Sequence, residues 1–304
     1  MKSFLTLMQR EWLQHRFGWS LLALLPLGLA VFLLGVGEID FGAEASERVG
    51  DALPAVVTVI GLTAGMALTF IIIAVTSLIL VSGLSRRDHQ DRSIEFWLSL
   101  PTSHTSSLAA PLLMHLLVVP AVALGVGLLG GWLAGMVVVT RLAGFGAWLA
   151  LPWGDITVAA LAMLGRVIIG LPLALLWVAP LILAQMLFNA WFKRWGLPVL
   201  LLALALSGLL VERWLGLGSV SLLIGDVLRN AGQALLATGA HHLEPRSAQA
   251  LFETLRTMPG WALSDLGSAF RALGTPLFLG CLLSAAGLFA LLVDWRRRGA
   301  GVAG

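Results

Sequence analysis

Few residues in this 304-residue chain have the types and spacing that catalysis needs. His241 and His242 are adjacent, so a helix would not present both to one ion as it does a pair at i and i+4. Residues 83–87 resemble half of a nucleophile elbow, but an arginine occupies the position of the final glycine. Neither Lys2 nor Lys193 follows the glycine loop that binds phosphates in a P-loop. The sequence therefore predicts no catalytic residue and no metal ligand, and any ATP hydrolysis would need a second polypeptide.

Polar side chains inside long apolar segments are a second group of candidates, because they can line a path for a substrate. They are Thr69, Thr76, Ser77, His115, Asn189 and Ser207. Hydrogen bonding between helices explains most such residues without any substrate. His115 is the one ionisable group among them, and such a group inside a span is often functional. It also lies close enough to the end of its segment to be an ordinary interfacial residue.

The composition indicates which elements must position these residues. Hydrophobic residues make up 59% of the chain and charged residues 12%, whereas a soluble domain has roughly a quarter charged residues. Several nearly uncharged runs are at least about 18 residues long, which is enough to cross a hydrocarbon core of about 30 Å. The sequence therefore predicts an all-α, polytopic membrane protein.

Six transmembrane helices are expected within a single transmembrane domain that covers the whole chain. They span about residues 19–37, 53–82, 106–138, 166–190, 197–214 and 275–294. Residues 1–17 have an apolar and a polar face, which predicts an amphipathic helix on the membrane surface or, alternatively, an extension of the first span. Residues 216–274 predict helices packed over the outer mouth or partly re-entrant, one of which we expect to end at Pro259-Gly260.

Lysine and arginine residues set the expected orientation. Most of them fall in segments that lie on one side when the N-terminus is cytoplasmic, as at residues 86–92, 193–194 and 296–298. The first loop on the opposite side is acidic, with Glu38 and Asp40 among its residues. Both termini are therefore expected in the cytoplasm, which agrees with an even number of spans.

A charged segment separates the second and third predicted spans, and we expect residues 83–105 to form a cytoplasmic loop. Within it, Ile94, Trp97 and Leu98 are spaced to share one helical face, and Pro101 would end that helix. The product is a short helix with an apolar face and charged flanks. Such a helix suits docking to a soluble partner, although it would equally suit resting on lipid headgroups.

The phrase Arg92-Ser-Ile-Glu-Phe-Trp-Leu-Ser-Leu-Pro101 resembles the loop between spans two and three of bacterial ABC-2 type transporter permeases, many of which carry a similar R-S-I-x-F-W-x-S-L-P phrase. The expected plan of the whole chain also resembles that family. The resemblance implies an exporter subunit in the bacterial cytoplasmic (inner) membrane, working as a dimer with a second permease copy or a paralogue.

In that family the loop carries a coupling helix, which contacts a separate ATPase subunit that binds ATP and Mg²⁺. Two ATPase copies are implied, and nucleic acid is not a partner. Carried over by position, the residues that contact the ATPase are Asp91, Arg92, Ser93, Ile94, Glu95, Phe96, Trp97 and Leu98.

A nucleotide-independent membrane carrier or a membrane scaffold is the alternative function. The sequence offers no pair of carboxylates inside the spans to relay protons, which weakens a proton-coupled carrier. The transported substrate is not indicated, and neither is the choice between homodimer and heterodimer. The role of residues 216–274, and whether the chain exports or acts only mechanically, are equally open.

Overall fold

The computed structural model describes residues 2–38, 50–90, 103–215, 220–236 and 248–300. All regular structure within these ranges is helical, which confirms the all-α class. The elements of the first half are α1 (Lys2–Val36), the 3-10 helix η1 (Gly50–Ala52), α3 (Leu53–Gln90), α5 (His104–Leu113), the π-helical turn η2 (Met114–Val118) and α6 (Val119–Ala143). Those of the second half are α7 (Phe145–Leu149), α8 (Trp153–Phe192), the 3-10 helix η3 (Lys193–Trp195), α9 (Gly196–Leu215), α10 (Val220–Leu235), α11 (Ala248–Ala272) and α12 (Pro276–Ala300).

Long apolar helices dominate the described part of the chain, as a multi-pass membrane protein requires. Five segments there are long and apolar enough to cross a membrane: Phe4–Val36, Leu53–Ser85, His104–Ala143, Trp153–Leu210 and Pro276–Arg298. The fourth contains both α8 and α9, which we predicted as separate spans. The six-span count therefore remains a prediction.

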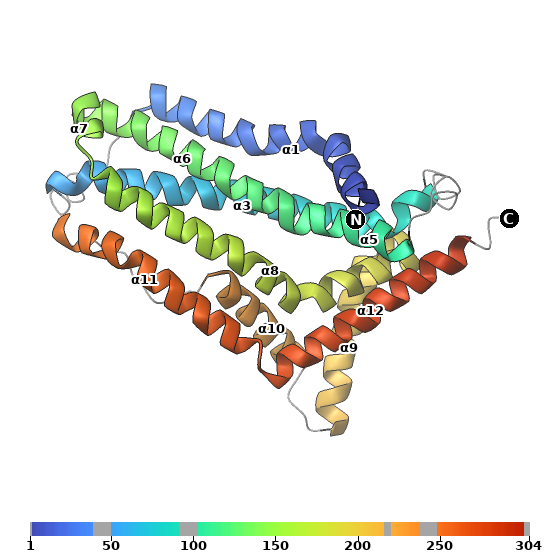
Figure 1. Cartoon of the computed structure of the whole chain (residues 1–304). Coiled ribbons are helices and arrows are strands. Elements are labelled where there is room, and N and C mark those ends of the chain that lie inside the picture. The colour runs from blue at the N-terminus through green and yellow to red at the C-terminus, as the bar shows by residue number, and fades with distance from the viewer. Residues whose placement is uncertain (1, 39–49, 91–102, 216–219, 237–247, 301–304) are drawn as a thin grey trace.

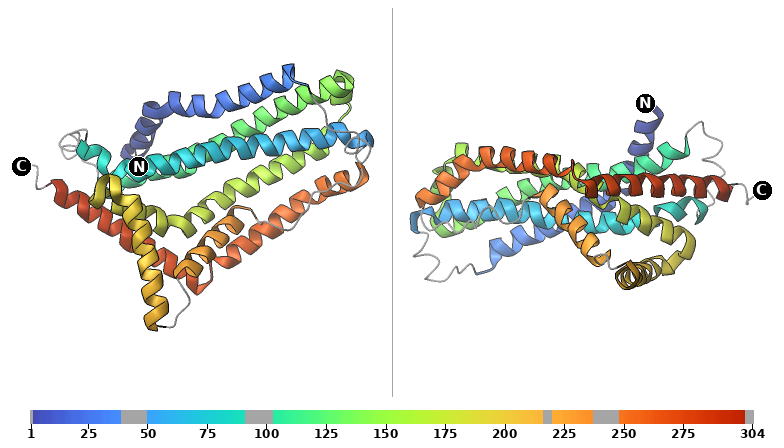
Figure 2. Two further views of the ribbon diagram at one scale, coloured as in Figure 1. Left: turned by 180° about the vertical axis from the view of Figure 1, so that it is seen from behind. Right: turned by 90° about the horizontal axis from the view of Figure 1, so that it is seen from below.

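The long helices lie lengthwise beside one another. Figure 1 shows α1, α6, α3, α8 and α11 in this order across the molecule, and the view from behind in Figure 2 agrees. Contacts follow the same order, with α1 against α6, α6 against α3, α3 against α8 and α8 against α11. The end of α3, the start of α5 and the end of α12 gather at one end of the molecule, called the terminal end below (Figure 1).

Glycines bring α3 and α6 unusually close together. Gly61 and Gly65 on α3 face Gly127, Gly131 and Gly135 on α6. A Cβ atom on Gly61 would lie 2.9 Å from the carbonyl oxygen of Gly131. A Cβ atom on Gly65 would lie 2.7 Å from the Cα atom of Gly131. Backbones can approach this closely only where side chains are absent.

Other glycines of α6 differ in what they face. A Cβ atom on Gly130 would lie 2.6 Å from Cδ1 of Leu27, so this glycine makes room for α1. Gly125, in contrast, has open space where a Cβ atom would be. Not every glycine of α6 therefore marks a close helix contact.

The chain turns sharply between α8 and α9. Lys193 adopts a positive φ of 56°, a conformation that non-glycine residues seldom take, and it ends α8. After this turn α9 points away from the row of long helices, as both views in Figure 2 show.

The described part of residues 216–274 consists mainly of α10 and α11, which lie beside the long helices. α11 lies lengthwise along α8 rather than across the end of the bundle (Figure 1), and α10 packs between them. α11 also continues through Pro259, so the predicted stop at Pro259-Gly260 is wrong. Leu255, Met258 and Ala262 are all buried on one face, and their packing holds the helix together across the missing hydrogen bond.

Two predicted boundaries near the terminal end can be compared with the helices. α1 is one continuous helix, so residues 2–17 extend the first predicted span, which was one of the two arrangements expected for them. α3 extends to Gln90, so the first part of the predicted loop 83–105 is helical. The predicted coupling helix, residues 91–98, lies outside the described residues.

Candidate functional site: the terminal end and two buried polar clusters

A buried apolar cluster lies at the terminal end, where α3 ends and α5 begins. We call it the base cluster. It consists of Val81, Leu84, Leu108, Leu183, Met186, Leu187, Ala285, Leu292 and Val293. These residues come from α3, α5, α8 and α12, so the two helices that flank residues 91–102 are both packed against the second half of the chain.

Hydrogen bonds reinforce this packing. The Ser85 hydroxyl donates to the carbonyl oxygen of Met186 at 3.0 Å, and the Asn189 amide donates to the carbonyl oxygen of Ser82 at 2.9 Å. Both bonds join the end of α3 to the end of α8. Asn189, which was predicted to line a pathway, therefore joins α8 to α3 through its side chain.

Ser103 is the residue that caps the start of α5. Its φ and ψ of −71° and 146° are extended, and its hydroxyl accepts a hydrogen bond from the backbone N–H of Ser106 at 3.2 Å. This is the geometry of a helix N-cap. The third long apolar segment therefore begins directly after a defined residue, Ser103.

The other predicted lining residues do not meet in a common cavity. The hydroxyls of Thr69, Thr76 and Ser207 donate to carbonyls of their own helices, at 2.8–2.9 Å. Ser77 is buried, and its hydroxyl has no hydrogen-bond partner within the described residues. An apolar cavity of about 450 Å³ between α1, α3 and α6 includes none of the predicted lining residues in its walls. The described part of one chain thus offers these residues no shared polar channel.

His115 is wholly buried and faces another titratable residue. It lies in the π-helical turn η2, and its Nε2 is 3.4 Å from Oε2 of Glu11 on α1. Glu11 is only 1% exposed. Sequence reasoning identified His115 but missed Glu11, because α1 was expected to keep its polar face at the membrane surface.

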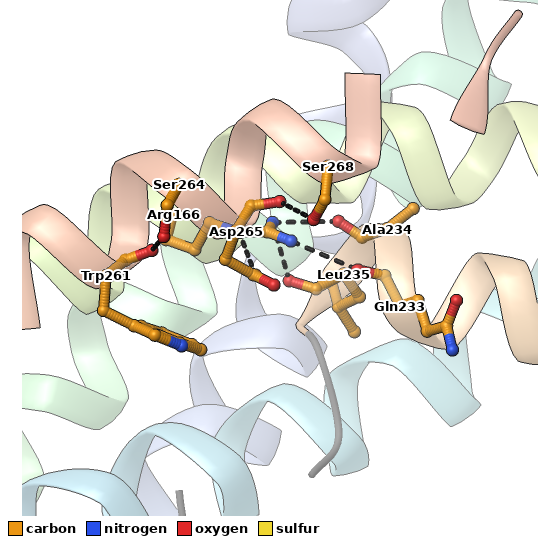
Figure 3. Close-up of polar contacts among 8 residues, drawn as sticks. All are labelled: Arg166, Gln233, Ala234, Leu235, Trp261, Ser264, Asp265 and Ser268. Carbon is orange, nitrogen blue, oxygen red and sulfur yellow. Dashed lines mark hydrogen bonds and ion pairs between the residues drawn. The ribbon is translucent and has the colours of Figure 1, made fainter. Parts of the chain in front are cut away.

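A second buried cluster joins α8, α10 and α11, and sequence reasoning missed it entirely. Arg166 on α8 is 2% exposed and Asp265 on α11 is 7% exposed. The Arg166 Nε donates to Oδ2 of Asp265 at 2.7 Å. Figure 3 shows the guanidinium between this carboxylate and the end of α10.

The remaining donors of Arg166 cap α10. Nη1 donates to the carbonyl oxygens of Ala234 and Leu235 at 2.9 and 3.1 Å, and Nη2 to that of Gln233 at 3.2 Å. These carbonyls are at the negative end of the helix dipole, where a cation is favourable. The planar fork of arginine suits several acceptors at once. One side chain therefore satisfies both the carboxylate and the otherwise unbonded carbonyls at the end of α10.

Gly170 makes room for this arrangement one helical turn along α8. A Cβ atom there would lie 2.8 Å from the carbonyl oxygen of Leu235, closer than real Cβ atoms approach. The available sequence signal was a lone arginine inside an apolar segment, since such a charge needs a partner. Which acid serves as that partner could not be known from the sequence, because Asp265 is 99 residues away.

No family model, curated protein or solved structure matches this chain.

Proposed function

We propose that this chain is the membrane-spanning subunit of an ATP-driven exporter of the ABC-2 type. The supporting observation is the charged phrase that ends at Pro101, which resembles the coupling loop of those permeases and connects two long apolar helices. The ends of these helices lie together at the terminal end (Figure 1), where a soluble subunit could reach the loop.

The proposed topology has six crossings, with α8 and α9 counted separately because the chain turns at Lys193. Both termini lie in the cytoplasm of a bacterial cell, since basic residues are concentrated near the terminal end and cytoplasmic loops carry an excess of them. Examples are the η3 residues Lys193 and Arg194 and the α12 residues Arg296–Arg298.

Residues 91–98 would contact the ATPase, with Ile94 and Trp97 entering its cleft. Movement of this segment would be transmitted through α3 and α5 into the base cluster, because Val81 and Leu108 pack there against α8 and α12. The pathway would form between two permease chains. This assignment is compatible with the described part of one chain, where the cavity between α1, α3 and α6 has none of the candidate polar residues in its walls.

The proposal is tested by purifying the tagged chain from its native membranes in mild detergent and identifying what comes with it by mass spectrometry. We expect a stoichiometric soluble protein with a P-loop. Trp97→Asp should abolish this association by placing a charge in an apolar contact. Insertion and helicity should not change, because the substitution lies outside the spans.

Trp195→Asp is the matched control, since Trp195 is an exposed tryptophan of the neighbouring η3. It should leave the association intact. If wild-type protein of normal helicity brings no P-loop protein with it, the exporter assignment is wrong and the carrier or scaffold alternative takes its place.

A further inference from the structure

Three potential metal ligands meet where α1 crosses the start of the third long segment. Glu11 and His15 are four positions apart on α1 and therefore share one face of that helix. His115 approaches them from η2. One ligand atom from each residue lies within 4.8 Å of those from the other two.

The distance between Glu11 and His115 suits a metal better than a direct hydrogen bond. Their Oε2 and Nε2 atoms are 3.4 Å apart, whereas charge-assisted N–H···O bonds are about 2.7–2.9 Å long. Two ligands of a tetrahedral zinc ion, each bonded at about 2.0–2.1 Å, are about 3.4 Å apart. The pair already has the separation that a shared ion would impose, and His15 has a ligand atom within 4.8 Å of both.

The burial of His115 makes the bonding of its ring important. Its side chain is completely buried, and its Nδ1 has no hydrogen-bond partner among the described residues. Leaving a buried polar group unbonded is costly, on the order of 1–3 kcal/mol. Nε2, the ring nitrogen that faces the cluster, has only the 3.4 Å contact with Glu11 within the described part of the chain. A metal ion bound at Nε2 would give this buried ring a stronger bond than that contact does, and Nδ1 would stay outside the site.

The backbone and the surroundings of His115 are also typical of a functional site. η2 is a π-helical turn inside an otherwise α-helical segment, and such turns are frequent at functional sites. The Trp19 ring lies 5.6 Å from that of His115 and is itself buried, so the cluster is shielded on that side by an apolar wall. Apolar shells of this kind limit the access of water to a metal.

We propose that Glu11, His15 and His115 form a binding site for a divalent transition-metal ion of the zinc class. Two imidazoles and one carboxylate are a known zinc ligand set, in which water takes the fourth position. Magnesium and calcium are disfavoured because they prefer six or more oxygen ligands. An ion bound here would join α1 to the α5–α6 segment close to the terminal end.

The test uses the full chain, purified in detergent, stripped with a chelator and then equilibrated with Zn²⁺. We expect about one zinc per chain by mass spectrometry of the metal, and no displacement by excess Mg²⁺. Loss of an outer-shell partner typically lowers metal affinity 10–100-fold. Loss of a ligand, as in His115→Gln or Glu11→Gln, should lower the affinity at least tenfold.

His104→Gln is the matched control, because His104 lies one helix earlier, on α5, and outside the cluster. It should bind zinc as the wild type does. If a buried substitution prevents folding, His15→Ala replaces it, since His15 is only partly buried. The proposal is overturned if helical wild-type protein takes up no zinc. It is also overturned if the cluster variants and His104→Gln bind zinc equally well, which would place the metal elsewhere.

Discussion

Two interfaces hold the long helices together in opposite ways. α3 and α6 meet through glycines, with their backbones in close contact. α8, α10 and α11 meet around a buried arginine that bonds a carboxylate and three carbonyl oxygens. The first interface depends on the absence of side chains, whereas the second depends on the side chain of Arg166. Substitutions should therefore damage them through different mechanisms.

The largest effect is expected at the second interface. Arg166→Ala would leave Asp265 buried without its cation and the end of α10 without its cap. Removing one partner of a buried pair costs about 3–5 kcal/mol. We expect a correspondingly large fall in the thermal stability of the purified protein in detergent, followed by circular dichroism. Wild-type stability in this variant would show that the guanidinium does not hold α10 and α11 in place.

A smaller effect is expected at the glycine interface. Gly131→Val would force α3 and α6 apart, since a Cβ atom there would lie 2.8 Å from Cα of Leu62. Overpacking of this kind typically costs about 1–3 kcal/mol. The same unfolding measurement applies, with Gly125→Ala as the control because nothing lies within 4 Å of its Cβ position. Equal stability of the two variants would mean that close packing is not what joins these helices.

The contrast also explains what the sequence could predict. Glycines at a spacing of four residues lie on one face of a helix, so the close packing of Gly127, Gly131 and Gly135 was visible locally. The N-cap at Ser103 was visible for the same reason. Both signals are contained within a single turn or a single helix face.

Contacts between distant residues were not predictable in this way. Arg166 and Asp265 are 99 residues apart, and Glu11 and His115 are 104 apart. No local pattern tells which buried charge meets which. The passage of α11 through Pro259 has a similar origin, because tertiary packing overrides the local tendency of proline to end a helix. The ATPase-contact residues 91–98 stay a prediction from resemblance.

The smallest effect distinguishes burial from charge pairing as the source of strength in the second interface. Arg256 on α11 pairs with Asp155 on α8, and their Nε and Oδ2 atoms are 3.0 Å apart. This pair joins the same two helices as Arg166 and Asp265, but the Arg256 side chain is 69% exposed. Exposed ion pairs contribute about 0–1 kcal/mol, because water and salt screen them. Arg256→Ala should therefore hardly change the unfolding temperature, and added salt should change the unfolding temperature of the wild type by a similarly small amount.

If Arg256→Ala instead destabilised the protein as much as Arg166→Ala does, charge pairing between α8 and α11 would matter more than burial. The capping of α10 by Arg166 would then not be what makes this interface stable.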